Sequence, residues 1–445
     1  MLLKLLFPRP KFAADWKGTY EEKAAEWSEL FLDLVMVSGC ANVSEILKED
    51  LTWNGLMKFL AIFSLLLSGW QLYLFYTCRY SDNSFVGDFV TFAYFYGMSF
   101  MVMNAEPGVK FTTGAIMQRI AMILFYMIVF RTLVAARTQL IYEFCILFTG
   151  LLILGTSLAF GEDRAIYFYA LTILVEVPIN YELMARVWNY LKSRDICVSP
   201  ANIDHYTERQ GCLLMVVLGE SVVSAVINTN DVMERSKTKL FMVVGISLLI
   251  TYSIALFYFS IIPPRELNAQ RRSVRHGLSY TLANQILFVC LLAMGVGIKF
   301  ITSAILDDKH LNTIQLNVLF IPTAISMFCM LIIRLLHFWG REPRENDPEI
   351  VKQIKYFWWG SIMVSPVLPI LGNLLLRYVY NKSIPPEAAV TTLFLTVFVY
   401  IILEQLIAHY LRALGYGYLS DSTEETTSLL RNEGYGSVET SMSAS

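Results

Sequence analysis

Long apolar stretches separated by short polar segments extend along most of this chain of 445 residues. A helix needs about 20 mainly apolar residues to cross the hydrocarbon core of a bilayer. The pattern therefore predicts an all-α fold, a polytopic transmembrane helix bundle with about 12 spans. The expected spans are residues 27–47, 54–78, 85–103, 114–136, 139–160, 165–190, 210–228, 239–262, 277–303, 313–338, 355–379 and 386–411.

The composition agrees with a protein whose main partner is a lipid bilayer. Hydrophobic residues make up 56% of the chain and charged residues only 16%, whereas soluble domains carry roughly 25% charge. The formal net charge of −2 gives a nucleic-acid partner no electrostatic support. The cysteines form no CxxC pair, and no hydrolase, metalloprotease or phosphate-binding signature occurs. We therefore expect no metal site, no cofactor and no set of catalytic residues.

The distribution of Lys and Arg predicts the orientation of the chain. With about 12 spans, basic residues such as Lys11 and Arg271 concentrate in the segments on the side of the N-terminus. Because cytoplasmic loops carry an excess of Lys and Arg, we expect both termini in the cytosol. Residues 1–26 would form a cytosolic N-terminal segment, 27–411 the transmembrane bundle, and 412–445 a cytosolic tail that is disordered by composition.

The first predicted helix carries a polar stripe on an otherwise apolar surface. Glu29, Asp33, Cys40 and Ser44 recur at spacings of 4, 7 and 4 residues, which places them in one sector of the helix. An ionisable group at the bilayer centre costs at least about 2.5 kcal/mol, so these carboxyls should face the protein interior. A hydrogen-bonded helix pair near the cytosolic interface is the structural alternative to a functional site.

The seventh predicted helix repeats this arrangement. Glu220, Ser224 and Asn228 follow one another at intervals of four residues and therefore lie on one face. Arg209 is about 15 Å from Glu220 along the helix, so the partner of Glu220 must come from another helix.

The sixth predicted helix contains the segment ILVEVPIN, in which Pro178 removes a backbone hydrogen-bond donor. Glu176 lies within the opened turn and Asn180 one turn later, so a carboxylate, an amide and a spare carbonyl converge. Transporters place ions at broken helices of this kind. A simple kink gives the same pattern.

Two arginines, Arg119 and Arg131, lie inside the fourth predicted helix. A lone guanidinium in a bilayer is as costly as a lone carboxylate. We therefore expect Arg131 to pair with one of the carboxylates of Asp33, Glu176 and Glu220. Arg119 is expected to extend its head group to the membrane interface.

Three segments combine into a pattern that goes beyond hydropathy. The first is the opening EWSELFLDLVMV, and the second is HYTERQGCLLMVVLGES, from His205 to Ser221. The third and weaker part consists of Arg131 in FYMIVFRTL and Glu176 in LVEVPIN. Together they resemble the low-temperature requirement A family, known from bacteria and present in many lower eukaryotes, whose patterns are Glu-Leu-Phe-Phe-Asp-Leu-Val, His-x-x-Glu-Arg and Leu-Gly-Glu-Ser. The resemblance covers about residues 24–300, and this chain is similar to the eukaryotic type of member.

The resemblance implies a multi-pass membrane protein but no particular substrate. It singles out Glu29, Asp33, Arg131, Glu176, His205, Glu208, Arg209, Glu220 and Ser221. Asn284 stands roughly where the family often has His, which puts a proton-relay role at that position in doubt. Helices one and seven each carry a carboxylate in mid-helix, which is compatible with a parallel 6+6 repeat.

The interior carboxylates favour a transporter or channel for a small ion or solute, coupled to protons through Asp33, Glu176 or Glu220. An enzyme acting on lipid through His205 and Glu208 is one alternative, and a non-catalytic scaffold or stress-adaptation protein is another. A cavity lined by Glu220 and Asp33 would favour transport, and a lipid-facing groove ending at His205 would favour the enzyme. A dry bundle in which every carboxylate is salt-bridged would favour the scaffold.

The tail contains two short patterns that resemble sorting signals. Glu425, Leu429 and Leu430 fit an acidic dileucine motif, and Tyr435 and Val438 fit a tyrosine motif. Adaptor proteins of the clathrin type read such motifs in flexible cytosolic segments. We therefore expect an endosomal, lysosomal or vacuolar membrane as the address, with the plasma membrane as the alternative.

Overall fold

The computed structural model describes residues 10–14, 25–82, 84–176, 199–226, 234–263, 268–338, 348–381 and 383–413. These residues are almost entirely helical. Among them, 10 helices are long and apolar enough to cross a membrane, or up to 11 if one bent pair of helices counts as a span. The predicted all-α polytopic bundle is therefore confirmed.

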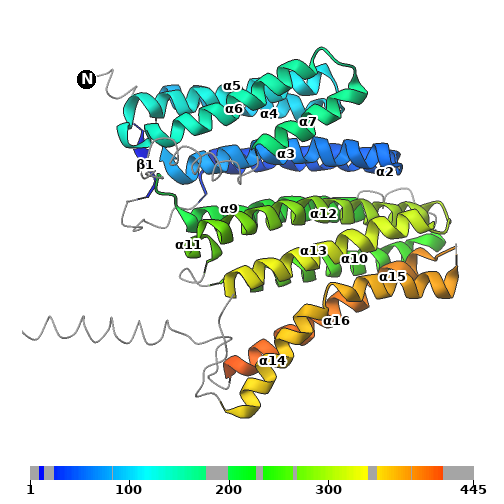
Figure 1. Cartoon of the computed structure of the whole chain (residues 1–445). Helices are drawn as coiled ribbons and strands as arrows, with labels where there is room; N and C mark the ends of the chain where they lie inside the picture. The colour runs from blue at the N-terminus through cyan, green and yellow to red at the C-terminus, as the bar shows by residue number, and fades with distance from the viewer. Residues whose placement is uncertain are drawn as a thin grey trace, which may run out of the picture.

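Among the described residues, six main helices form the N-terminal half of the bundle (Figure 1). They are α2 (Trp27–Glu49), α3 (Trp53–Arg79), α4 (Phe85–Met103), α5 (Val109–Thr132), α6 (Arg137–Ser157) and α7 (Glu162–Glu176), with a 3-10 turn η1 (Val134–Ala136) between α5 and α6. A short strand β1 (Lys11–Phe12) pairs antiparallel with β2 (Tyr80–Ser81) directly after α3. The rest of the predicted sixth span, which includes Asn180, lies outside the described residues.

The C-terminal half begins with α9, and its described residues include a pair of helices that are bent relative to each other. Its helices are α9 (Ile203–Val226), α10 (Glu234–Ile261), α11 (Ala269–Arg272), α12 (Val274–Leu306), α13 (Thr313–Phe338), α14 (Glu349–Val364), α15 (Val367–Tyr380) and α16 (Pro386–Ala413). The axes of α14 and α15 differ by 49°. Pro366 lies at this bend and cannot donate a backbone hydrogen bond, which explains why the predicted span 355–379 is broken there.

The two halves repeat one packing pattern when α14 and α15 are counted together. In the first half α2 packs on α3 and α4, α4 on α5, α5 on α6, α6 on α7, and α7 returns to α3. In the second half α9 packs on α10 and α12, α12 on α13, α13 on α15, α15 on α16, and α16 returns to α10. The order of contacts is the same, as expected for a 6+6 arrangement.

The halves meet along α2 and α9, which lie next to each other in the middle of the stack in Figure 1. Three side-chain contacts between these helices share one sequence separation, 176 residues: Glu29 with His205, Asp33 with Arg209, and Ser44 with Glu220. A constant separation means that α2 and α9 run parallel and keep one register. A parallel repeat requires this direction for the first helix of each half.

The helix α9 begins earlier than the sequence predicts, at Ile203 rather than near residue 210. The side-chain oxygen of Asn202 accepts a hydrogen bond from the backbone N–H of His205 at 3.0 Å, in the manner of an N-cap. The predicted seventh span, 210–228, does not include the segment from His205 to Arg209. The structure instead buries His205 and Arg209 against α2, so a helix can accommodate them.

Candidate functional site

The three carboxylates that the sequence pattern emphasises are buried in the bundle. Asp33, Glu176 and Glu220 are 6%, 6% and 2% exposed. The prediction that Asp33 and Glu220 face the protein interior is therefore confirmed. Each carboxylate lies beside a cationic side chain of another helix. A buried charge requires such a partner, because desolvation otherwise makes it costly.

Asp33 of α2 forms a two-pronged ion pair with Arg209 of α9. The two guanidinium nitrogens lie 2.6 and 2.7 Å from the two carboxylate oxygens. Trp70 of α3 donates its indole N–H to Asp33 at 2.9 Å, and Arg209 also donates to the backbone carbonyl of Glu29 at 3.1 Å. Both groups are thus held by several hydrogen bonds, which makes this a fixed contact between the halves.

Glu29 lies one turn before Asp33 and contacts His205. The Nε2 atom of His205 is 2.9 Å from a carboxylate oxygen of Glu29. The other oxygen of Glu29 accepts from the backbone N–H of Glu26 at 2.9 Å, which completes a capping box at the start of α2. These contacts connect the first turns of α2 and α9. Together with Asp33 and Arg209 they form what we call the Asp33–Arg209 cluster.

Glu176, at the last described residue of α7, pairs with Arg119 of α5. The two nitrogens of Arg119 lie 3.1 and 2.8 Å from the two carboxylate oxygens, and Ser68 of α3 donates its hydroxyl to Glu176 at 2.6 Å. Arg119 is completely buried, so the prediction that it reaches the interface is wrong. Pro178 lies outside the described residues, so the expected site at a broken helix is not tested there.

Arg131 is not the partner of the buried carboxylates that the sequence pattern predicted. It lies near the end of α5 and is exposed. The described cationic partners of the three carboxylates are Arg119, Arg209 and Lys299. The predicted pairing of Arg131 is therefore wrong.

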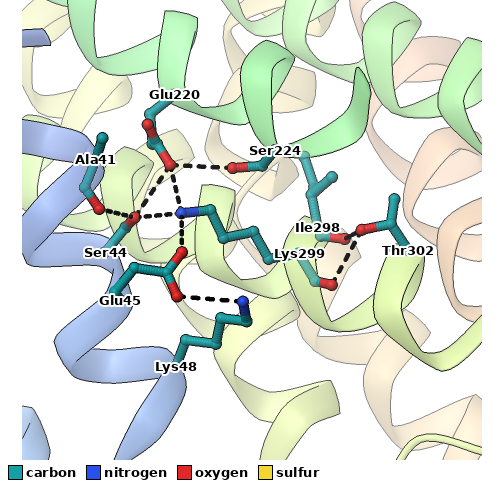
Figure 2. A network of polar contacts seen from close by, with 9 residues as sticks. All are labelled: Ala41, Ser44, Glu45, Lys48, Glu220, Ser224, Ile298, Lys299 and Thr302. Carbon is teal, nitrogen blue, oxygen red and sulfur yellow. Dashed lines mark hydrogen bonds and ion pairs between the residues drawn. The ribbon is translucent and has the colours of Figure 1, made fainter. Parts of the chain in front are cut away.

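The second cluster at the interface of the halves centres on Glu220 of α9 and Lys299 of α12, shown in Figure 2. The ammonium of Lys299 is 2.5 Å from a carboxylate oxygen of Glu220 and 3.0 Å from one of Glu45 on α2. Two hydroxyls surround the same oxygen of Glu220: Ser44 donates at 3.0 Å and Ser224 at 3.1 Å. Lys299 also donates to the hydroxyl of Ser44 at 2.5 Å. The ammonium of Lys299 thus forms ion pairs with both Glu220 and Glu45.

This Glu220–Lys299 cluster continues toward the end of α2. Glu45 also accepts from Lys48 at 3.1 Å. The side chain of Glu220 is 3% exposed and that of Lys299 11%, whereas Glu45 is 44% and Lys48 36% exposed. The row of alternating carboxylates and ammonium groups therefore leads from the buried Glu220 and Lys299 to the partly exposed Glu45 and Lys48.

A close approach of α9 and α12 brings the two helices together beside Glu220. A Cβ atom added to Gly295 would lie 2.9 Å from the hydroxyl oxygen of Ser221, so the absence of a side chain there is needed. The neighbouring Gly219 has open space around it instead. Ser221 is completely buried and its hydroxyl has no hydrogen-bond partner among the described residues.

Apolar side chains separate the two clusters. Between Asp33 and Ser44, the α2 residues Met36 and Cys40 are completely buried. The matching stretch of α9 contributes buried leucines and valine: Leu213, Leu214 and Val217. The clusters are 11 residues apart on each helix, by subtraction of the paired positions, which corresponds to roughly 16 Å along the axis.

Sequence reasoning missed two buried ion pairs. Lys299 was not considered, although it is a single lysine inside the apolar run GVGIKFITSAIL. Arg334 of α13 lies 3.0 Å from Glu404 of α16, and its guanidinium stacks over the ring of Trp358. This pair joins the fourth and sixth helices of the second half, as Arg119 and Glu176 join those of the first half.

The two residues of the alternative enzyme site differ in their surroundings. His205 is buried against Glu29, whereas Glu208 is exposed. In the described part of the chain, no group of three or more His, Cys, Asp and Glu residues is arranged to hold a metal ion. A cavity of about 400 Å³ exists elsewhere, but neither Asp33 nor Glu220 lines it. The sorting patterns, from Glu425 to Val438, lie outside the described residues.

Comparisons with family models, curated proteins and solved structures bear on the family of this chain. No curated protein and no solved structure matches the chain. A family model described as "Bacterial low temperature requirement A protein (LtrA)" matches residues 24–415, which includes the last helices as well as the motifs of α2 and α9. This multi-pass membrane protein therefore belongs to the LtrA family.

Proposed function

We propose that the protein transports a small ion or solute across the membrane, and that a proton binds to and leaves the Glu220–Lys299 cluster during transport. The supporting observation is that Lys299 is shared between the buried Glu220 and the partly exposed Glu45. Glu45 also has an alternative partner, since it contacts Lys48.

Shared partners allow Glu220 to change its charge at low cost. If Glu220 takes up a proton, Lys299 retains Glu45 and the hydroxyl of Ser44, so no buried charge is left alone. The neutral carboxylic acid can donate to one of the two hydroxyls that already lie about 3 Å away. The partly exposed Glu45 and Lys48 form a polar route from the surface to Glu220.

The other carboxylates lack this property. Protonation of Asp33 would leave the guanidinium of Arg209 with the backbone carbonyl of Glu29 and without a hydrogen-bonded carboxylate. A guanidinium cannot release its own proton at physiological pH. The apolar stretch around Met36 and Cys40 would then be a barrier that has to open before an ion crosses, as hydrophobic constrictions do in channels.

The test is proton flux into proteoliposomes that enclose a pH-sensitive dye, under an imposed pH gradient. We expect the wild type to acidify the lumen faster than protein-free liposomes, and Glu220→Gln to lose at least about 90% of this excess rate. Glu208→Gln, an exposed carboxylate of the same helix, is the matched control and should retain the rate. A wild-type rate equal to that of empty liposomes, or an unimpaired Glu220→Gln, would contradict the proposal.

A static membrane scaffold is the second candidate, and one observation favours it. The described interior carboxylates Asp33, Glu176, Glu220 and Glu404 all have cationic partners. A bundle that only needs to hold its helices together would have such pairs. Wild-type protein that is folded but carries no flux of any tested ion would favour this function.

We also propose that the protein resides in an acidic endosomal, lysosomal or vacuolar membrane, with both termini in the cytosol. The basis is the dileucine pattern around Leu429 and Leu430 together with the tyrosine pattern at Tyr435. An acidic lumen would supply protons to titrating carboxylates. Imaging of tagged protein tests the address: the triple variant Leu429→Ala, Leu430→Ala, Tyr435→Ala should shift to the plasma membrane. Unchanged localisation would refute it.

A further inference from the structure

A cavity of about 400 Å³ lies at the end of the bundle where α2 and α4 begin and α3 ends. This volume is in the range of small-molecule sites in proteins. The exposed rings of Trp27 and Phe92 line its mouth, so it opens toward the surroundings of the bundle. Its lining contains none of the residues of the Glu220–Lys299 cluster.

Aromatic rings make up much of the wall. Tyr73, Tyr76, Phe95 and Phe125 are buried and line the cavity. The ring centroids of Tyr76 and Phe125 are 4.6 Å apart, and those of Tyr73 and Phe95 are 5.5 Å apart. Ring faces carry negative electrostatic potential and attract cations within about 6 Å. A wall of this kind therefore suits a cationic group with an apolar body.

The polar part of the wall is acidic. The described lining residues include Glu26, Asp82 and Asp88 and no Lys, Arg or His. Glu26 caps α2, and one oxygen of Asp82 accepts from the backbone N–H of Ser84 at 3.0 Å. These local contacts explain Glu26 and one oxygen of Asp82 without any ligand.

Two polar atoms of the wall are not accounted for in this way. The second carboxylate oxygen of Asp82 and the hydroxyl of Tyr76 are buried and have no hydrogen-bond partner among the described residues. Tyr76 is 4% exposed. Both residues line the cavity. Burial raises the pKa of the Asp82 carboxyl above its usual range, which a bound cation would reverse. Buried polar atoms normally have partners, so these two point to a ligand.

We propose that this cavity binds a protonated amine. The N–H donors of the ammonium group would satisfy the free oxygen of Asp82 and the hydroxyl of Tyr76, while the rings of Tyr73 and Phe125 contact its charged face. The ammonium is either that of a free small amine or the head group of an aminophospholipid, since the mouth at Trp27 is exposed. This site is independent of the proposed transport, because it lies wholly within the N-terminal half.

The experiment is calorimetric titration of the purified full chain with ethanolamine, in nanodiscs made of phosphatidylglycerol. We expect saturable binding, and at least fivefold weaker binding of choline, which has the same charge but no N–H donor. In nanodiscs that also contain phosphatidylethanolamine, a lipid ligand would compete and reduce the ethanolamine affinity. Unchanged affinity there would assign the site to a free amine.

Two variants test the residues, and both are expected to fold. Asp82→Asn keeps an oxygen that can accept from Ser84 and removes the charge, and Tyr76→Phe removes a hydroxyl that has no described partner. We expect at least tenfold weaker ethanolamine binding in Asp82→Asn and at least threefold in Tyr76→Phe. Glu106→Gln, at an exposed position outside the cavity, is the matched control and should bind as the wild type does.

Several results would overturn the assignment. They are absence of saturable ethanolamine binding in both kinds of nanodisc, choline binding as tight as ethanolamine binding, and full affinity in Asp82→Asn. None of them depends on ion flux, so the failure of this site and the failure of the transport proposal can be told apart.

Discussion

Two charge clusters lie on the same pair of helices and differ in how their charges are shared. In the Asp33–Arg209 cluster, a carboxylate and a guanidinium face each other through two hydrogen bonds. In the Glu220–Lys299 cluster, one ammonium lies between two carboxylates. The first cluster is near the start of α2 and α9, and the second is near their ends. The helix register is the same at both.

Under the proposed function, burial alone does not separate a structural ion pair from a site that changes its protonation. Asp33 and Glu220 are buried to a similar degree. Removal of the charge on Asp33 leaves the buried guanidinium of Arg209 without a hydrogen-bonded carboxylate, whereas removal of the charge on Glu220 leaves Lys299 with Glu45. The number of alternative partners is therefore the informative property.

The largest effect is expected for Asp33→Asn, which breaks the fixed pair. Loss of one partner of a buried ion pair costs about 3–5 kcal/mol of stability. We expect Asp33→Asn to unfold at a clearly lower temperature than the wild type in detergent, as measured by intrinsic fluorescence. The double variant Asp33→Asn, Arg209→Gln should lose less than the sum of the two single variants. Wild-type stability of Asp33→Asn would show that this pair is not structural.

A smaller loss of stability is expected for Glu220→Gln. The amide oxygen of Gln can still accept from Ser44 and Ser224, and Lys299 keeps Glu45, so we expect a cost of about 1–2 kcal/mol. The same thermal unfolding assay gives this value beside that of Asp33→Asn. Equal losses in the two variants would remove the distinction between the clusters.

The next effect in size is that of Glu45→Gln. Because the side chain of Glu45 is 44% exposed, its ion pairs should contribute no more than about 1 kcal/mol. Its loss nevertheless removes the second carboxylate of Lys299. We expect proton flux to fall several-fold while the unfolding temperature changes little. Normal flux in Glu45→Gln would exclude this residue from the polar route.

The smallest effect is expected for Lys48→Gln at the surface end of the row. Surface substitutions of this kind change stability by no more than about 0.5 kcal/mol. We expect a small reduction of flux, and a weaker one at high ionic strength, because salt screens exposed charges. A loss of flux as large as that of Glu220→Gln would contradict the place of Lys48 at the outer end of the row.

The sequence predicts the fold and the buried carboxylates well, because the cost of charge in a bilayer leaves few arrangements. It does not predict their partners. Arg119 and Arg131 are 12 residues apart and therefore point about 120° apart on α5, so only one can face the interior. The helix is apolar on all sides, and hydropathy could not show which side faces the bundle.

Lys299 and the pair of Arg334 with Glu404 could be recognised only from the tertiary structure. Each of these charges lies in a long apolar helix, and the partner is at least 70 residues away along the chain. The packing order of the two halves places Arg119 with Glu176 and Arg334 with Glu404 at equivalent positions. A weak internal similarity in the sequence was compatible with this repeat, but it does not reveal which helices touch.

The central claim is that Glu220 takes up a proton inside the folded protein and Asp33 does not. Infrared difference spectroscopy between neutral and acidic pH measures this directly, because a protonated carboxyl group absorbs separately from a carboxylate. We predict one band of a buried carboxylic acid in the wild type that disappears in Glu220→Gln. The same band should persist in folded Asp33→Asn, Arg209→Gln protein. A band that persists in Glu220→Gln, or disappears with Asp33, would contradict the account.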